Sequence, residues 1–223
     1  MSTDGLSTSP DVVVSRNDRA LSRRLLVIPA IVVGLVVLGI GMVVVRDGTV
    51  PGWERRIFHA INDLPDFLYR PLWPFQQLGA LLVGPLVAIV ALLFRRYRLA
   101  IALLIATVAK LVCERLVKVV SSRQRPGTSI GPDVHLRGDV SPVGESFVSG
   151  HAVLIAAIAG LVTPYLPGRW KIVPWVVVGL VMVTRVYVGA HNPMDVVCGA
   201  ALGLAIAGLI NLFLGPRAKD GAK

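Results

Sequence analysis

Long apolar segments alternate with short polar connectors along this chain, and their lengths suit a membrane crossing. Residues 25–45 form a run of twenty-one residues without a charge, enough to span a bilayer at about 1.5 Å of rise per residue. Five further apolar segments follow, at 72–94, 99–120, 147–166, 172–188 and 193–214. The pattern predicts an all-α, polytopic membrane protein with six transmembrane helices in a bundle.

The two ends of the chain differ from this pattern. Residues 1–20 are polar and lack helical periodicity, which predicts a disordered tail. Residues 21–215 then form one six-helix membrane domain, and 216–223 form a second short tail. The first apolar run is too long for a signal peptide and no A-x-A site follows it, so we expect it to be a retained anchor.

Lysine and arginine counts predict the orientation, since cytoplasmic loops keep the positive excess. The side that holds both termini carries twelve such residues: Arg16, Arg19, Arg23, Arg24, Arg95, Arg96, Arg98, Arg169, Lys171, Arg217, Lys219 and Lys223. The other side carries seven: Arg46, Arg55, Arg56, Arg70, Arg123, Arg125 and Arg137. Both termini are therefore predicted to be cytoplasmic, in a multi-pass protein of the cell membrane.

Composition agrees with a membrane protein and excludes other classes. Hydrophobic residues make up 54% of the chain and charged residues 16%, with a mean hydropathy of +0.70. The net charge of +10 is scattered over the ends of apolar runs, without interleaved aromatic residues, so we expect no nucleic acid partner. Cys113 and Cys198 lie in apolar segments and suggest neither a disulfide framework nor a cysteine-rich metal site.

Two long connectors, 46–71 and 121–146, lie on the outer side in this topology. Apolar residues recur in the first at helical spacing: Trp53, Ile57, Ala60, Ile61 and Leu64. The spacing predicts a short helix that either covers the bundle or lies in the membrane interface.

A first charged cluster ends the third span. Lys110, Glu114 and Lys118 recur every four residues and so share one helix face, which allows a structural ion pair between Lys110 and Glu114. Around Lys118 and Arg125 basic residues outnumber acids. This imbalance favours a bound anion there.

A second cluster, Phe147-Val148-Ser149-Gly150-His151, opens the fourth span. Ser149 suits a helix N-cap, and the free N–H groups that follow it favour an anion. A plain capping role for Ser149 and His151 is the alternative.

The third cluster lies between the last two spans, over "TRVYVGAHNPMD", residues 184–195. Asn192 suits the N-cap of the sixth span and Pro193 its first turn, so Asp195 lies close enough to approach His191. Such a carboxylate fixes the imidazole tautomer and leaves the other ring nitrogen free to react. The alternative is that Asp195 only caps its own helix.

The three clusters fall at the same end of the predicted bundle and are expected to form one phosphate site. The candidate residues are the cations Lys118, Arg125 and Arg185, the donors Ser149 and Gly150, and the acid–base groups His151, His191 and Asp195. Arginine forks match phosphate oxygens, and fixed donors stabilise a phosphoryl transition state. We expect His191 to be the nucleophile and His151 the general acid. No metal-binding spacing accompanies them, so no metal or other cofactor is predicted.

The order Lys118-x6-Arg125-Pro126, Ser149-Gly150-His151 and Arg185-x5-His191-x3-Asp195 resembles the three-part signature of the type 2 phosphatidic acid phosphatase superfamily, the lipid phosphate phosphatases. The resemblance implies phosphate binding by Lys118, Arg125 and Arg185, a His191 nucleophile supported by Asp195, and a His151 acid. It also implies metal-independent hydrolysis of lipid phosphates or diphosphates at the outer membrane surface, with vanadate as a transition-state mimic.

Two positions depart from that signature. Val148 replaces the usual proline of the second motif, and Thr184 replaces the usual serine of the third. Neither change removes a charge, so we expect altered geometry or substrate preference and retained activity. The sequence predicts a membrane lipid phosphatase, for example for a polyprenyl diphosphate, that acts through a phosphohistidine at the extracytoplasmic face. The alternatives are a lipid phosphotransferase and a non-catalytic lipid-phosphate binder or transporter.

Overall fold

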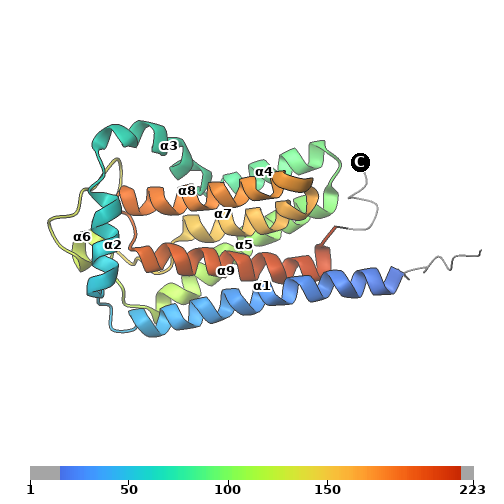
Figure 1. Ribbon diagram of the computed structural model, residues 1–223, viewed down its shortest axis with the longest axis horizontal. Helices are drawn as coiled ribbons and strands as arrows, with labels where there is room; N and C mark the ends of the chain where they lie inside the picture. The colour runs from blue at the N-terminus through green and yellow to red at the C-terminus, as the bar shows by residue number, and fades with distance from the viewer. Residues whose placement is uncertain (1–15, 217–223) are drawn as a thin grey trace, which may run out of the picture.

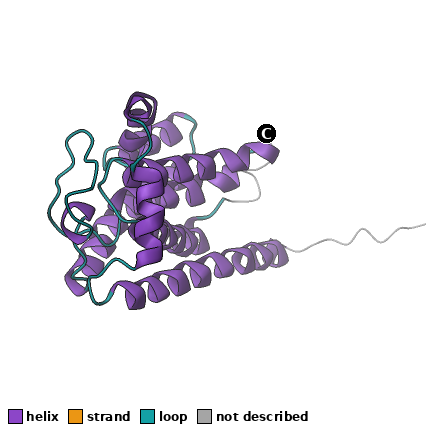
Figure 2. Cartoon of the chain, turned by 60° about the vertical axis from the view of Figure 1, so that its left-hand side comes forward, coloured by secondary structure: helices purple, strands orange, loops and turns teal. Residues whose placement is uncertain are grey.

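The computed structural model describes the backbone of residues 16–216 and the side chains of residues 27–216. Helices make up every regular element in this range, and no strand occurs in it (Figure 2). The predicted all-α class is confirmed for these residues. Most of the first predicted tail, 1–15, and nearly all of the second, 217–223, lie outside the described part of the chain.

Four of the predicted segments appear as helices close to the expected bounds. They are α5 (Tyr97–Val120), α7 (Gly150–Val162), α8 (Val173–Tyr187) and α9 (Pro193–Leu214). Helix α1 is longer than expected and covers Arg16–Val45, so the prediction of a disordered tail is wrong for residues 16–20. Arginine, alanine and leucine are good helix formers, and this stretch extends a helix that is already nucleated.

The predicted span 72–94 is not one continuous helix. It consists of α3 (Tyr69–Leu78) and α4 (Val83–Leu93), which are bent by 67° at the break between them. Gly79 ends α3 where the side chain of His151 packs closely, since a Cβ on Gly79 would lie 2.6 Å from the His151 Cβ. Hydropathy along the sequence cannot indicate this contact between two distant residues.

By length and composition, three helices of the described chain suit a membrane span: Val27–Val45, Gly168–Tyr187 and Pro193–Leu214. The second includes the short 3-10 helix η3 (Gly168–Ile172). The bent α3–α4 pair makes a fourth if it counts as one span. Charges interrupt α5, and α7 with its 3-10 extension η2 (Thr163–Tyr165) is short. Six spans and cytoplasmic termini therefore stay predictions.

Helix α7 lies at the centre of the bundle and packs against α5, α8 and α9. Glycines on α9 permit the close contact between α7 and α9. A Cβ on Gly199 would lie 2.7 Å from the Ser149 carbonyl oxygen. One turn further, Gly203 meets the carbonyl of Val153 in the same way. Small residues four apart let two helix backbones approach. The start of α7 is thereby fixed against the start of α9.

Helix α2 (Gly52–Asn62) lies across one end of the bundle, as Figures 1 and 2 show. The predicted short helix in the first connector is thus confirmed, but the face that packs inward differs from the apolar stripe of the sequence. Glu54, Phe58 and Asn62 are fully buried, while Trp53 and Ile57 are each 44% exposed. The face of α2 that contacts the bundle therefore combines one aromatic and two polar side chains.

Two further short elements lie at this end. The 3-10 helix η1 (Asp66–Leu68) follows α2, and α6 (Pro126–Ser129) lies in the second long connector. The described chain begins and ends at the opposite end of the bundle (Figure 1).

Candidate active site

The predicted site residues come from four helix ends and two connectors at the α2 end of the bundle (Figure 1). Lys118 lies in the last turn of α5, Arg185 in the last turn of α8, and Asp195 in the first turn of α9. Ser149 is the N-cap residue of α7 and is followed by His151. Arg125 immediately precedes α6. The structure thus brings the three sequence clusters together at one end.

Asp195 links the second cluster to the third. Its Oδ2 accepts a hydrogen bond of 2.7 Å from the backbone N–H of Asn192, as part of a capping box at the start of α9. Its own carbonyl oxygen accepts one of 3.0 Å from the Ser149 N–H. Asp195 therefore caps its helix, as the alternative interpretation supposed, but it also makes contacts beyond that helix.

A serine lies between the predicted nucleophile and its carboxylate. The Ser146 hydroxyl donates a short hydrogen bond to Asp195 Oδ2 and lies 3.4 Å from His191 Nδ1. The direct distance from Nδ1 to Oδ2 is 3.7 Å, beyond a hydrogen bond. A chain from Nδ1–H through the Ser146 hydroxyl to Asp195 satisfies all three groups. It places the proton on Nδ1 and leaves the lone pair on Nε2.

The surroundings of His191 favour a neutral ring. Its exposed fraction is 3%, and burial lowers its pKa to about 4, with the Arg185 cation acting in the same direction and Asp195 in the opposite one. A histidine with a depressed pKa keeps its neutral form above that pH and loses it only below. His191 is therefore available as a nucleophile at neutral pH.

We expect a direct titration of His191 to show this lowered pKa. In ¹⁵N NMR spectra of histidine-labelled protein in detergent, its ring should stay neutral at pH 7 and protonate only as the pH falls towards about 4. His191→Gln identifies the signal by its loss. A midpoint near 6.5, the value of an unperturbed histidine, would contradict the environment described above.

Three polar groups at the site have hydrogen-bonding capacity to spare. The Nε atoms of Arg125 and Arg185 and the hydroxyl of Ser149 are buried and find no hydrogen-bond partner among the described residues. Ser149 occupies the N-cap position but its side chain does not cap the helix. Buried donors of this kind are costly unless something binds them. They suit the oxygens of a phosphate group.

Lys118 is less free than the sequence suggested. Both Lys110 and Lys118 contact Glu114, each at 2.7 Å from a carboxylate oxygen. The predicted Lys110–Glu114 pair is confirmed, and Lys118 shares the same carboxylate. Glu114 in turn lies against the Cα of Gly150, where a Cβ would overlap it. Glu114 thus holds Lys118 beside the start of α7.

The sequence interpretation missed a buried ion network. The Arg123 Nη2 donates to Glu54 Oε2 at 2.6 Å, and its Nε lies 3.5 Å from Asp195 Oδ1. All three side chains are fully buried. Burial raises the pKa of Glu54, while Arg123 acts to lower it. Removing one partner of a buried pair costs about 3–5 kcal/mol, so loss of either Glu54 or Arg123 would destabilise the fold.

Of the missed residues, Ser146 had the clearer sequence signal, because it immediately precedes the second cluster, three residues before Ser149. Arg123 counts in the sequence only as a positive charge of the outer side, and Glu54 lies outside the three charged clusters. The buried face of α2 consists of Glu54, Phe58 and Asn62, which follow one another at intervals of four residues.

His151 faces the break between α3 and α4 through its contact with Gly79. The cations Arg185 and Arg125 lie near enough to act on it electrostatically. Among the described residues, no group of three His, Cys, Asp or Glu side chains has the geometry of a metal site. The side chains gathered here are two imidazoles with cations and neutral donors.

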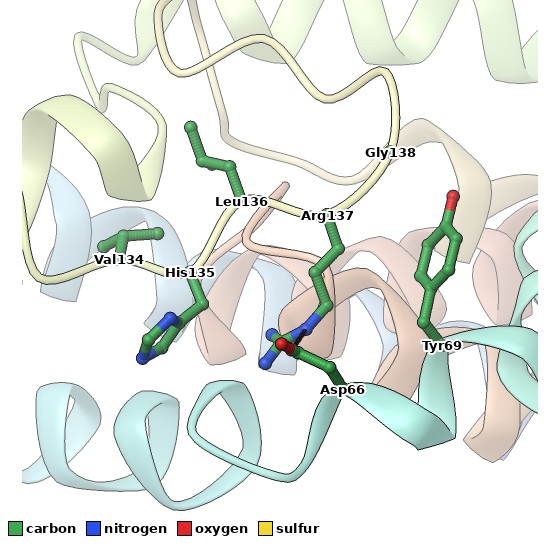
Figure 3. A pocket seen from close by; sticks show the side chains of 7 residues that line it. All are labelled: Asp66, Tyr69, Val134, His135, Leu136, Arg137 and Gly138. Atoms are coloured by element: carbon green, nitrogen blue, oxygen red, sulfur yellow. Dashed lines mark hydrogen bonds and ion pairs between the residues drawn. The ribbon is translucent and has the colours of Figure 1, made fainter.

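A cavity of about 450 Å³ lies at the same end of the molecule but is lined by other residues. Figure 3 shows its lining: Asp66, Tyr69, Val134, His135, Leu136, Arg137 and Gly138. Arg137 donates to Asp66 at 2.9 Å and to three backbone carbonyls, those of Asn62, Leu64 and Tyr187. These four hydrogen bonds of its guanidinium join the two connectors to the end of α8. None of the predicted catalytic residues lines this cavity.

Comparison with known proteins identifies the same family as the three motifs do. Residues 98–219 match the family model of the PAP2 superfamily, and the chain belongs to this superfamily. An undecaprenyl-diphosphatase of Sulfolobus acidocaldarius is 32% identical over 121 residues, which cover 53% of this chain and 57% of that protein. The chain therefore aligns with little more than half the length of this relative.

Two solved structures share the fold. The crystal structure of Aquifex aeolicus LpxE superposes with a TM-score of 0.63 at 26% identity and covers 70% of this chain and 93% of the other. The first transmembrane PAP2 type phosphatidylglycerolphosphate phosphatase from Bacillus subtilis gives a TM-score of 0.57 at 20% identity. Here 79% of this chain and 93% of the other are covered. The family resemblance seen in the three motifs is confirmed.

Proposed function

We propose that this protein is a metal-independent phosphatase of membrane lipid phosphates, with its active site at the extracytoplasmic face of the cell membrane. The observation that carries the proposal is the buried His191, whose Nδ1 faces Ser146 and Asp195 while the cations Arg125 and Arg185 act on it. A neutral imidazole that is fixed in one tautomer beside unsatisfied arginine donors suits attack on a phosphoryl group. The excess of basic residues on the side of the termini supports the sidedness.

The proposed reaction has two steps. The Nε2 lone pair of His191 forms a bond to phosphorus, the bond from phosphorus to the bridging oxygen breaks, and His151 gives that oxygen a proton. A water molecule then loses a proton to His151 and attacks phosphorus, which breaks the N–P bond and releases inorganic phosphate. Arg125, Arg185, Lys118 and the donors at Ser149 and Gly150 stabilise the charge on the phosphoryl oxygens.

We propose a polyprenyl diphosphate as the substrate. The related Sulfolobus protein, named an undecaprenyl-diphosphatase, supports this choice. The products would be the polyprenyl monophosphate and inorganic phosphate. The apolar helices beside the site offer a place for the lipid chain within the bilayer.

Phosphate release from a panel of lipids tests the proposal. The purified protein in detergent, with a chelator present, is incubated with undecaprenyl diphosphate, phosphatidate and phosphatidylglycerol phosphate. We expect phosphate release that is fastest with undecaprenyl diphosphate and unaffected by the chelator. An absolute requirement for added divalent metal would contradict the mechanism, and faster release from another lipid would contradict the substrate.

The same panel separates hydrolysis from phosphotransfer. Each lipid is also supplied with a second lipid alcohol as acceptor, and the products are resolved by chromatography. Hydrolysis predicts that the phosphoryl group removed from the lipid appears only as inorganic phosphate. Transfer of the phosphoryl group to the acceptor alcohol in preference to water would identify a phosphotransferase.

A further inference from the structure

A carboxylate on the end-covering helix α2 reaches the catalytic network from outside the three motifs. Glu54 has no exposed surface, and both of its oxygens are used. Oε2 accepts from Arg123 at 2.6 Å and Oε1 accepts from the backbone N–H of Met194 at 2.7 Å. Met194 immediately precedes Asp195, so Glu54 contacts the first turn of α9 directly.

The two oxygens of Asp195 have different neighbours. Oδ2 accepts from Ser146 and from the Asn192 N–H, on the side of His191. Oδ1 faces the Nε of Arg123 at 3.5 Å, and neither atom has a hydrogen-bond partner among the residues described. Arg123 therefore stands close to Asp195 without completing a hydrogen bond to it.

We propose that Glu54 is a positioning residue, which by holding Arg123 keeps this guanidinium from engaging Asp195 and so leaves the Asp195 carboxylate to Ser146 and His191. Without Glu54, the buried Arg123 cation would have Asp195 as its nearest carboxylate, only 3.5 Å away. Asp195 would then stabilise less strongly the positive charge that develops on His191. The proposal rests on the function given above, since it concerns the same nucleophile.

A charge-matched pair of variants tests this role. Glu54→Gln keeps an oxygen that accepts from the Met194 N–H but removes the charge that balances Arg123. We expect kcat for undecaprenyl diphosphate to fall about tenfold or more with KM unchanged, within the range of coupling in one buried network. In the double variant Glu54→Gln/Arg123→Gln the misdirected cation is gone, and we expect most of kcat to return.

The fall and recovery of kcat, set beside the thermal midpoint, separate positioning from simple tethering of α2. If the pair only held α2 on the bundle, Glu54→Gln would lower the thermal midpoint and the double variant would restore it, while kcat of the folded protein would equal that of the wild type in both. An unchanged kcat in Glu54→Gln, or a double variant no better than the single one, would overturn the proposal. Arg56→Gln, on the exposed face of the same helix, is the matched control and should leave kcat unchanged.

Folding of each variant is checked by gel filtration in detergent and by its thermal midpoint. If Glu54→Gln does not fold, Glu54→Asp tests the same contact, because a side chain shorter by one methylene holds Arg123 less closely while it keeps the charge. The proposal then requires a fall in kcat at constant KM. An unchanged kcat in Glu54→Asp would contradict it.

A measurement without turnover distinguishes failure of this inference from failure of the proposed function. If the wild-type protein releases no phosphate from any lipid of the panel, the function is wrong. The ¹⁵N signal of His191 Nδ1 still reports on Asp195, and we expect Glu54→Gln to shift it and the double variant to restore it. An Nδ1 signal identical in the wild type and Glu54→Gln would overturn the inference alone.

Discussion

His191→Ala is expected to abolish phosphate release, with a loss of about ten-thousand-fold or more in kcat. The substitution removes the only group proposed to form a bond to phosphorus. The unsatisfied donors of Arg125 and Arg185 remain in place, so the variant should still bind vanadate or a lipid phosphate. Initial rates with undecaprenyl diphosphate, together with vanadate binding measured by calorimetry, separate loss of chemistry from loss of binding.

The matched control for this substitution is His135→Ala. The side chain of His135 is 61% exposed, and its hydrogen bonds to Asn62 are made by backbone atoms. Its activity should equal that of the wild type. Full activity in His191→Ala would remove His191 from its assigned role, and loss of vanadate binding would show that the ring positions the phosphate site as well.

The three charged clusters could be predicted because each is local. Asn192, Pro193 and Asp195 are a helix start that short-range chemistry specifies, and the structure has a capping box there. In the same way, Lys110, Glu114 and Lys118 share a helix face by their spacing, and the contacts within that face follow. Apolar length also located α5, α8 and α9 to within two residues.

Contacts between distant segments could not be predicted. Glu54 and Arg123 are 69 residues apart and join two connectors that the sequence shows only as polar and charged. The apolar stripe of α2 left open whether Trp53 and Ile57 face the bundle or the membrane interface. The inward face carries Glu54, whose fully buried ion pair with Arg123 holds the helix in this position.

The bend in the second predicted span has a similar cause. Every residue from 83 to 93 is apolar or glycine or proline, so hydropathy favours a continuous helix through this region. The packing of His151 against Gly79 depends on a residue more than seventy positions away. A sequence pattern contains no information on that approach: it placed His151 at a helix start but Gly79 inside the predicted span 72–94.

His151 is the group proposed to give a proton to the leaving oxygen. His151→Ala is expected to lower kcat by about 100- to 10,000-fold, the usual contribution of a general acid. The loss should depend on the substrate. A lipid diphosphate expels a weakly basic phosphate and needs little protonation, whereas phosphatidate expels a strongly basic alkoxide. We therefore expect a larger loss with phosphatidate than with undecaprenyl diphosphate.

In the proposed mechanism the second step needs His151 as the base that activates water, so phosphate should accumulate on the enzyme in His151→Ala. With undecaprenyl diphosphate labelled by ³²P in its terminal phosphate, the variant should retain acid-labile label that is absent from His151→Ala/His191→Ala. Equal losses with both substrates would argue against proton donation by His151. Label that persists in the double variant would place the phosphoryl group on a residue other than His191, and the attack would then have to begin elsewhere in the site.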